Sequence, residues 1–292
     1  MATERGVNIT AVCCQLGYSK QAYYKAKKTR QCADCHRAEV LEMVLSVRRQ
    51  MPRLGVRKLY HLLGPSLQKE KIPIGRDLLF QWLKESNLLV SRKKRYVKTT
   101  DSRHWMRRYP NLVKGVVPDH PEQHWVADIT YITTRQGFSF LHLLTDAYSK
   151  KIMGYELCND MLATSTLKAL QMALANRQYN SLITHHSDRG LQYSSTTYLE
   201  QLKSAGLHVS TTQDGSPYDN AVAERINGIL KDEFGLDAVF DNFEQLQKQT
   251  KQSIEIYNVK RPHLSCSFLT PQQMHNQKEI EVKTWRKKRC EG

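Results

Sequence analysis

The sequence predicts an α/β fold with a mixed five-stranded sheet, preceded by all-helical segments. Three observations support this prediction. Strand-like and helix-like segments alternate from about residue 118, residues 38–90 repeat apolar side chains at helical spacing, and the excess positive charge is confined to the first third of the chain. A 40% content of hydrophobic residues favours a packed core over a disordered chain.

The first 90 residues are expected to form two helical parts. Residues 8–30 suit two short helices around a turn at Gly17, and a polar connector is expected at 28–36. Residues 38–90 suit a compact helical unit, whose helices should be separated at Gly55, at Gly64-Pro65 and at Pro73-Ile74-Gly75. Both parts are similar to helix-turn-helix DNA-binding segments, and an ordinary helical bundle with solvated charges is the alternative.

The net charge of +16 has an uneven distribution. Residues 1–110 contain 24 Lys and Arg against eight Asp and Glu, whereas residues 111–292 contain 20 of each. A polyanion, and nucleic acid in particular, is therefore the expected partner of the first third. A ribosomal or membrane-surface protein is the competing interpretation. The basic residues 91–108 suit a linker that follows a phosphate backbone or serves as a hinge.

The segments from residue 118 onward predict the sheet and its helices. Three strand candidates come first, and helices then alternate with two further strands, which is the order of an α/β fold with a mixed sheet. The expected strands are 124–133, 138–145, 151–158, 181–186 and 207–210, and the expected helices are 162–176, 194–205, 219–234 and 243–258.

Three carboxylates stand at positions where they could share one cleft. Asp128 lies among apolar neighbours in the first strand, where an unpaired buried carboxylate would cost several kcal/mol. Asp188 follows the fourth strand, before a turn that contains a glycine, and Glu224 lies within a helix. Carboxylate oxygens are ligands that Mg²⁺ prefers, and two such ions can drive an in-line phosphoryl displacement.

The helix that carries Glu224 has a polar face and an apolar stripe. At 100° per residue, Glu224 and Lys231 fall on one face, away from Ile226 and its apolar neighbours. A carboxylate and an ammonium group could therefore address a metal ion and a phosphate from one rigid support. Asp219, which opens this helix, is expected to be a cap.

Four ordered motifs carry a resemblance to a known family. They are WVADITY (125–131), HSDRGLQY (186–193), YDNAVAE (218–224), and YNVKRPH (257–263) followed by Thr270-Pro271. In addition, 35 residues separate Asp188 from Glu224, and Lys231 stands seven positions after Glu224. With these motifs the chain resembles the retroviral-integrase-like transposases, and especially the second-reading-frame (OrfB) subunit of the insertion-sequence-three family. Arg225 departs from the small polar residue that relatives often carry.

The resemblance implies an RNase H-like core in which Asp128, Asp188 and Glu224 form a catalytic triad. It implies two Mg²⁺ ions, with Mn²⁺ as a substitute, and an enzyme that cleaves DNA and transfers a 3′-OH strand. Asp146 matches a position of structural support. Candidate contacts to DNA phosphates are Lys231, Arg189, Arg57, Lys58, Lys93, Lys94 and Arg95.

The resemblance also implies partners. These are the terminal inverted repeats of a mobile element, target DNA, further copies of the same chain, and a first-reading-frame (OrfA) partner or fusion. Seven scattered cysteines fit a reducing bacterial cytoplasm, where the protein would associate with the nucleoid. The sequence contains no run of 18 apolar residues, so a membrane span is not expected.

Other interpretations stay open or are set aside. An RNase H-like nuclease without joining activity would need the same triad, and a decayed element could act as a non-catalytic DNA-binding repressor. Cys32, Cys35 and His36 match a haem-attachment pattern, but no export signal supports it. Zinc at these residues would need a ligand from outside the motif. His186 is a candidate helper of the phosphate or the metal ion.

The expected organisation has five parts. They are a short helix-turn-helix-like segment (1–36), a helical DNA-binding domain (37–90), a basic linker (91–117), the catalytic core (118–275) and a basic C-terminal tail (276–292).

Overall fold

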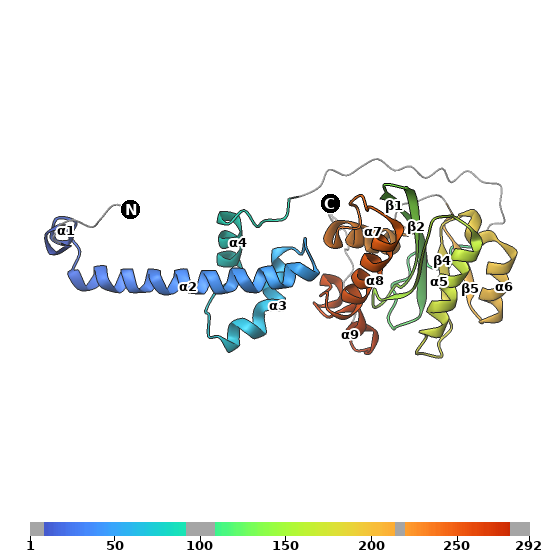
Figure 1. Ribbon diagram of the computed structural model, residues 1–292. Coiled ribbons are helices and arrows are strands. Elements are labelled where there is room, and N and C mark those ends of the chain that lie inside the picture. Colours follow the sequence, from blue (N-terminus) through green and yellow to red (C-terminus); the bar gives the residue numbers. More distant parts are fainter. Residues whose placement is uncertain (1–8, 92–108, 214–219, 281–292) are drawn as a thin grey trace, which may run out of the picture. The chain divides into compact units, whose positions relative to one another are not determined.

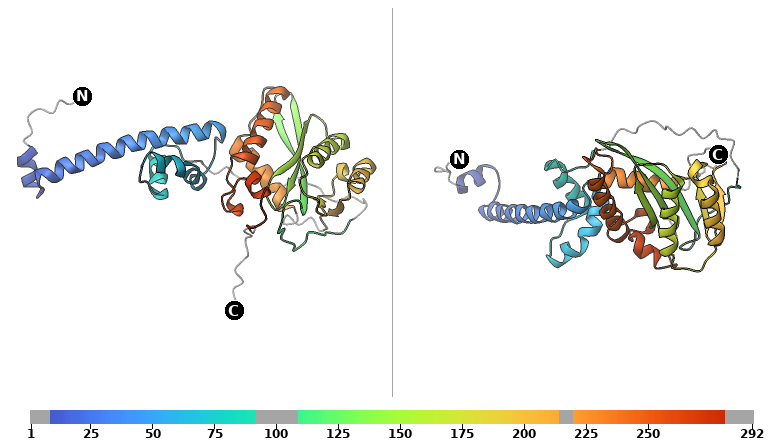
Figure 2. Two further views of the ribbon diagram at one scale, coloured as in Figure 1. Left: turned by 90° about the horizontal axis from the view of Figure 1, so that it is seen from below. Right: turned by 45° about the vertical axis from the view of Figure 1, so that its right-hand side comes forward.

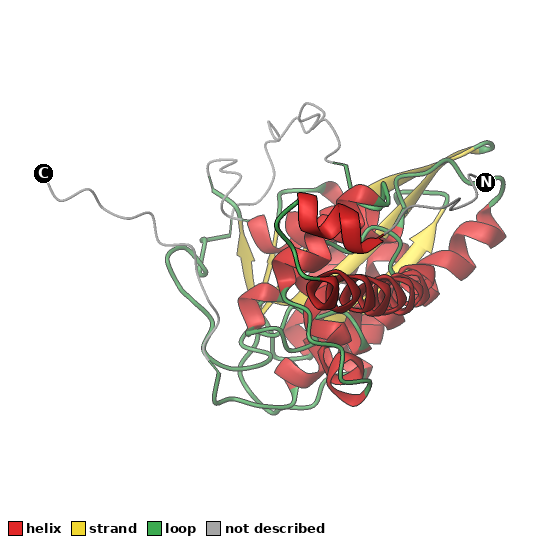
Figure 3. Cartoon of the chain, turned by 90° about the vertical axis from the view of Figure 1, so that its left-hand side faces the viewer, coloured by secondary structure: helices red, strands yellow, loops and turns green. Residues whose placement is uncertain are grey.

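The computed structural model describes residues 9–91, 109–213 and 220–280 (Figure 1). The chain divides into two compact units. The first consists of Met1–Arg49 and Leu59–Leu89, and the second consists of Gln50–Lys58 and Val90–Gly292. All strands that the structure describes belong to the second unit (Figure 3).

The long second helix corrects the first expectation. After α1 (Ile9–Gln15), α2 runs without a break from Lys20 to Gln50 and includes the stretch 28–36 that was expected to be a connector (Figure 2). The prediction was wrong because it gave polarity too much weight. The stretch contains neither glycine nor proline, and its Lys, Arg, Gln and Ala residues favour helix. Cys32 is exposed and His36 is half-buried on this helix, with Sγ and Nε2 3.8 Å apart.

The other helices of this part are α3 (Val56–Lys69) and α4 (Arg76–Glu85). The expected break at Gly64-Pro65 is wrong, because α3 continues through Pro65. Proline costs a helix interior about 3 kcal/mol, but Leu63 and Leu67, on either side of it, are buried, and their burial offsets that cost. The helix-turn-helix assignment of α3 and α4 stays a prediction.

The first unit has its own apolar core and internal anchors. Arg37 of α2 pairs with Glu85 of α4 at 2.8 Å, and Arg48 Nη1 donates to the Leu88 carbonyl at 2.5 Å. The buried apolar side chains include Val40, Val44, Leu59, Leu63, Leu67, Ile72, Leu79, Trp82 and Leu83.

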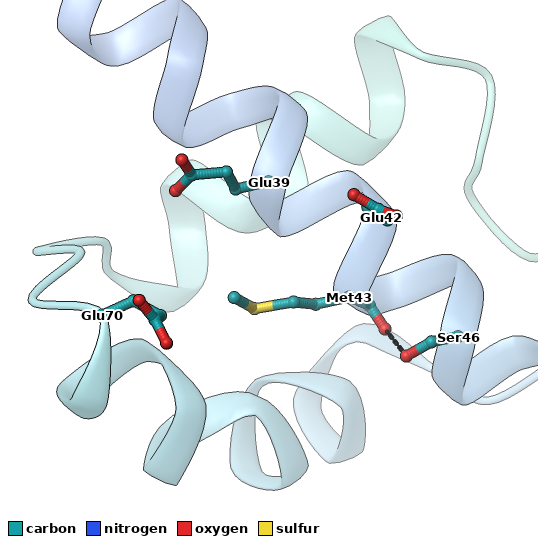
Figure 4. Close-up of a pocket in the computed structure, with 5 residues that line it drawn as sticks. All are labelled: Glu39, Glu42, Met43, Ser46 and Glu70. Atoms are coloured by element: carbon teal, nitrogen blue, oxygen red, sulfur yellow. Dashed lines mark hydrogen bonds between the residues drawn. The ribbon is translucent and has the colours of Figure 1, made fainter.

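A groove in this unit is acidic rather than basic. Glu39 and Glu42 of α2 and Glu70, which follows α3, surround Met43 and Ser46 (Figure 4). Three carboxylates would repel a phosphate backbone. A DNA-binding surface on this unit is therefore expected on a different side of α2.

The second unit contains the mixed five-stranded sheet that the sequence predicts. Its strands lie in the order β3-β2-β1-β4-β5. The pairs β1–β2 and β2–β3 are antiparallel, whereas β4 is parallel to both β1 and β5. The strands are β1 (His124–Thr134), β2 (Gly137–Asp146), β3 (Ile152–Cys158), β4 (Thr184–Ser187) and β5 (His208–Thr211).

Helices cover both faces of this sheet (Figure 1). On one face, Trp125 and Ala127 of β1 share a buried cluster with Leu170 of α5 and Tyr198 of α6. On the other face, Val126 packs against the start of α7. The remaining elements are α5 (Ala163–Ala175), the 3-10 helix η1 (Leu191–Ser194), α6 (Thr196–Ser204), α7 (Ala221–Phe234), α8 (Phe243–Val259), η2 (Leu264–Cys266) and α9 (Pro271–His275).

Close packing of α5 on β3 depends on Gly154. A Cβ atom at this position would lie 2.1 Å from the Ala169 carbonyl oxygen and 2.6 Å from the Ala173 nitrogen. Both are backbone atoms, so the whole helix would have to move. We expect Gly154→Ala to lower the free energy of unfolding by about 3 kcal/mol or more, measured by urea denaturation.

Gly228→Ala is the matched control for that experiment. Gly228 lies inside α7, and a Cβ atom there would have no neighbour within 4 Å. Alanine is the better helix former by about 1 kcal/mol, so this variant should be neutral or slightly more stable. Equal stability of the two variants would contradict the packing argument.

Asp146 provides the structural support that its motif implies. Its Oδ1 accepts the Glu122 N–H at 2.9 Å, and its Oδ2 accepts the Ser149 N–H at 2.8 Å. His275 of α9 lies between two carboxylates, with Nε2 3.2 Å from Glu122 and Nδ1 3.6 Å from Asp146. Burial alone lowers the pKa of His275, but the two carboxylates outweigh it, so the pKa is raised above the usual value.

This cluster predicts a pH dependence of stability. A histidine whose pKa is raised on folding stabilises the protein fully below its unfolded pKa, about 6.5, and the stabilisation is lost as the pH rises through the folded pKa. The metal-free protein should therefore lose unfolding free energy as the pH rises above about 6.5, because of His275. In His275→Asn this contribution should disappear from urea denaturation curves recorded at pH 6 and pH 9. An unchanged pH profile in the variant would contradict this role.

Candidate active site

The two aspartates meet where β1 and β4 separate. The parallel register pairs His124 with Thr184 and Val126 with His186, and the paired stretch of β1 ends there. Continuing the same register places Asp128 opposite Asp188, which directly follows β4. Beyond Val126, β1 has no further pairing with β4, and the next backbone partner described on β1 outside its pairing with β2 is Phe240, which bridges to Thr134.

The environment of Asp128 is unfavourable for a lone negative charge. Burial, and then the neighbouring Asp188, raise its pKa to about 7, and the charge of Glu224 acts in the same direction. Burial also raises the pKa of Asp188. Among the residues that the structure describes, neither aspartate forms an ion pair. The two neighbouring carboxylates therefore lack a directly paired counter-ion among the described side chains.

Hydrogen bonds from α7 orient Asp128. Asn227 Nδ2 donates to Asp128 Oδ2 at 2.7 Å, and Asn220 Nδ2 donates to the Ala127 carbonyl at 3.1 Å. The Ile129 N–H donates to Asp128 Oδ1 at 3.0 Å. The motifs alone did not single out Asn227. The signal was available, because Asn227 falls on the same polar face of α7 as Glu224 and Lys231.

The turn after β4 folds back on Asp188. The Gly190 N–H donates to Asp188 Oδ1 at 3.1 Å. A Cβ atom at Gly190 would lie only 3.1 Å from the same oxygen and 3.0 Å from Gln192 Oε1, so a larger residue would crowd the carboxylate. This close approach explains on steric grounds why a glycine stands at this position of the HSDRG segment.

His186 has a structural contact, and its role as a helper of the phosphate or the metal ion stays a prediction. It is fully buried in β4, and its Nδ1 lies 2.8 Å from Ser210 Oγ of β5. The neighbouring His185 contacts the Tyr198 hydroxyl through Nε2 at 2.9 Å. Both histidines therefore connect core elements.

Glu224 lies in the first turn of α7 with an exposed side chain. The predicted apolar stripe is confirmed, since Ile226, Ile229, Leu230 and Phe234 are all buried. In residues 9–91, 109–213 and 220–280, no three His, Cys, Asp or Glu side chains converge closely enough to hold a metal ion. The cap expected at Asp219 lies outside the described residues, and Asn220 occupies the N-cap position.

Oxygen donors that carry excess negative charge fit a hard divalent cation. Two half-buried carboxylates stand side by side, and the third carboxylate influences the charge of the first. A cation at this position would offset both the burial and the repulsion from Asp188 that raise the pKa of Asp128.

The predicted phosphate contacts have different surroundings. Lys231 is partly buried, and its Nζ lies 4.7 Å from the centre of the Tyr131 ring. Arg189 Nε donates to the Thr212 carbonyl at 2.8 Å, which connects the turn after β4 to β5. Arg57 is exposed. Lys93, Lys94 and Arg95 lie outside the described residues.

Lys58 requires a correction. It is buried and pairs with Glu233 of α7 at 2.5 Å, so it is not a free surface contact for DNA. Burial and the nearby Arg261 lower its pKa to about 8. Lys58 therefore belongs to the internal packing of the second unit.

The YNVKRPH motif is a scaffold for α7. Arg261 is 1% exposed and donates to both carboxylate oxygens of Glu233, from Nε at 2.8 Å and from Nη2 at 2.9 Å. The Tyr257 hydroxyl donates to the Lys150 carbonyl at 2.8 Å, and Asn258 bonds both backbone groups of Ile152. These contacts connect α8 to the sheet and to the helix that carries Glu224.

Comparisons with known proteins show which family the chain is similar to. Two family models described as "Integrase core domain" match residues 118–217 and 205–271. The Shigella sonnei "Insertion element IS600 uncharacterized 31 kDa protein" is 32% identical over 89% of this chain and 96% of its own length. The "Transposase for insertion sequence element IS629" of the same organism is 30% identical over 86% of this chain and 85% of its own length.

The chain is also similar to a third relative and to a solved structure. The Escherichia coli "Transposase InsF for insertion sequence IS3fB" is 37% identical over 54% of this chain and 55% of its own length. A solved structure of the HTLV-2 integrase catalytic core domain in complex with magnesium is 20% identical, with a TM-score of 0.44, over 53% of this chain and 97% of that one.

Family membership carries general consequences for the chain. It implies DNA as the substrate, and an integrase-like core implies dependence on a divalent metal ion. In the described part of the chain, no helix has the length and apolar character needed to cross a bilayer. On its motifs, its sheet and these relatives, the chain belongs to the insertion-sequence transposases with an integrase core, the DDE transposases similar to the OrfB subunit of the insertion-sequence-three family.

Proposed function

We propose that this transposase cuts and joins DNA strands at a divalent-metal centre held by Asp128, Asp188 and Glu224. The observation that carries the proposal is the pair of half-buried aspartates at the open end of β1 and β4, neither of which has an ion-pair partner within the described residues. Such a pair without a counter-ion is unfavourable for folding and suits the binding of a cation.

The metal ions would be two Mg²⁺, for which Mn²⁺ could substitute. When bound, they would acidify the attacking hydroxyl and neutralise charge on the transferred phosphate. Asn227 keeps the Asp128 carboxylate in one orientation, and Gly190 leaves space for that of Asp188. Lys231 stands on the same helix as Glu224, where its ammonium group can pair with a substrate phosphate.

The reaction has two displacements at phosphorus. In the first, a water oxygen attacks the phosphate at the end of the element, the bond to the 3′ oxygen breaks, and a 3′-OH and a 5′-phosphate remain. In the second, this 3′-OH attacks a phosphodiester of another strand, forms a new bond to phosphorus and releases the 3′ oxygen of the attacked strand. Both steps transfer the same kind of group, so one set of residues can serve both.

The same proposal extends to the partners. The substrates would be the terminal inverted repeats of the element and a target duplex, held by a homo-oligomer that brings two ends together. An OrfA partner or fusion would add DNA recognition. The complex would act in the bacterial cytoplasm, associated with the nucleoid. Arg57 and the basic residues Lys93, Lys94 and Arg95 would contact phosphates.

A titration with Mg²⁺ separates this function from its alternatives. Purified protein is mixed with a labelled duplex that carries the element's ends, and the products are resolved at increasing Mg²⁺. Metal-dependent cleavage followed by joined product is the expected result. Cleavage without joining, also when OrfA is added, would favour a nuclease. DNA binding with no cleavage at any Mg²⁺ or Mn²⁺ concentration would favour a repressor.

A further inference from the structure

An exposed pair of aromatic rings lies on the strands beside the aspartates. Tyr131 stands three residues after Asp128 on β1, and Phe138 stands on the adjacent β2. Their ring centres are 5.6 Å apart, and the ring planes meet at 82°. Tyr131 is 52% exposed and Phe138 is 60% exposed, whereas Trp125 on the same strand is fully buried. Large rings left in water next to a reaction centre indicate a contact surface.

The positive charge of Lys231 beside these rings limits which kind of molecule could cover them. The Lys231 ammonium group lies 4.7 Å from the centre of the Tyr131 ring, and the charge of Asp128 also acts on it. An apolar protein surface that covered the rings would have to remove this ammonium group from water, which is costly. A nucleotide brings both a flat π-surface for the ring and an anionic phosphate for the ammonium group.

The position of Tyr131 relative to Asp128 indicates which nucleotide of the DNA would stack on the ring. Three residues of a strand span about 10 Å, and side chains three positions apart leave opposite faces of the sheet. The link between the Tyr131 ring and Asp128 is Lys231, whose ammonium group lies 4.7 Å from the ring centre and is influenced by the charge of Asp128. A base on Tyr131 would therefore belong to a nucleotide near a phosphate held at Asp128. A base can stack on a side chain only when it has left its own stack. The surface therefore suits a single-stranded or frayed end.

We propose that Tyr131 and Phe138 form a stacking platform for an unpaired nucleobase beside the reacting phosphate, and that Lys231 pairs with a phosphate of the same nucleotide. This inference rests on the proposed strand-transfer function, because that function brings a DNA end to Asp128. Stacking on an aromatic ring tolerates any base, so the platform recognises an opened end rather than a sequence.

The first test uses 2-aminopurine, a fluorescent base that is quenched by stacking. It is placed in turn at each of the last three positions of the DNA end, and fluorescence is recorded with EDTA so that no strand is cut. Wild type and Tyr131→Phe, which keeps the ring, should quench the probe at one position. Tyr131→Leu should lose this quenching and bind the end about fivefold more weakly or worse, with an unchanged melting temperature.

The second test removes the base rather than the ring. On an end with an abasic nucleotide at the quenched position, wild type and Tyr131→Leu should bind equally, because the partner of the ring is absent. The inference is overturned if Tyr131→Leu quenches the probe as wild type does, or if its weaker binding persists unchanged on the abasic end. It is also overturned if Tyr131→Leu, without DNA, changes the oligomer size in gel filtration, because the rings would then be a contact between copies.

The two proposals can fail separately. Joined product from wild type with no effect of Tyr131→Leu on quenching would remove the platform and leave the strand-transfer function intact. Absence of metal-dependent cleavage would remove the proposed function, whatever the fluorescence shows.

Discussion

Glu224→Gln is expected to abolish joined product, with a loss of about 10³-fold or more. The substitution keeps the size of the side chain and removes the negative charge that would complete the metal centre. The Glu224 side chain is exposed on α7, so the fold should be unaffected. The measurement is strand transfer of a labelled DNA end in Mg²⁺, with a melting curve of each protein.

Glu244→Gln is the matched control for Glu224. Glu244 is also an exposed glutamate in the first turn of a helix, but that helix is α8. It should join DNA at the rate of wild type. If Glu224→Gln were as active as Glu244→Gln, the triad assignment would be wrong.

Arg261→Met is expected to cost about 3–5 kcal/mol of unfolding free energy. The substitution removes both hydrogen bonds to Glu233 and leaves a largely buried carboxylate with Lys58 as its remaining partner. Because Glu233 lies on α7, the helix of Glu224 should lose its fixed position, and joining should fall together with stability. Urea denaturation and the strand-transfer assay measure the two effects.

Arg135→Met provides the comparison for that loss. Arg135 pairs with Asp241 at 3.1 Å, but both side chains are largely exposed, and an exposed ion pair contributes about 1 kcal/mol or less. A cost for Arg261→Met no larger than that for Arg135→Met would show that the buried pair does not hold α7.

The sequence predicted the catalytic core well because its segments have clear periodicity. The alternating strand 124–133 and the apolar stripe of α7 both depend on local pattern, and burial of Ile226 and Phe234 followed from helix geometry alone. The juxtaposition of Asp128 with Asp188 could be anticipated only through the family motifs, because the parallel pairing of β1 with β4 is a long-range contact.

Other features could not be predicted for physical reasons. Helix α2 continues through residues 28–36 because this stretch contains no helix-breaking glycine or proline. Its polar composition instead suggested a connector. The sequence suggested that Lys58 is a surface cation. The fold shows that Lys58 is buried and that its ion pair with Glu233, which is distant in the sequence, offsets the cost of burying the charge. The bond from Asn227 to Asp128 likewise joins residues distant in sequence.

Metal binding by the three carboxylates tests the central claim most directly. The bound Mn²⁺ is counted by electron paramagnetic resonance, in the presence of a DNA end, for wild type, Asp128→Asn, Asp188→Asn and Glu224→Gln. Wild type should bind Mn²⁺, and each variant should lose binding at the same site while it still binds the DNA. If all three variants bound Mn²⁺ as wild type does, Asp128, Asp188 and Glu224 would not hold the metal ion, and the account of this active site would be wrong.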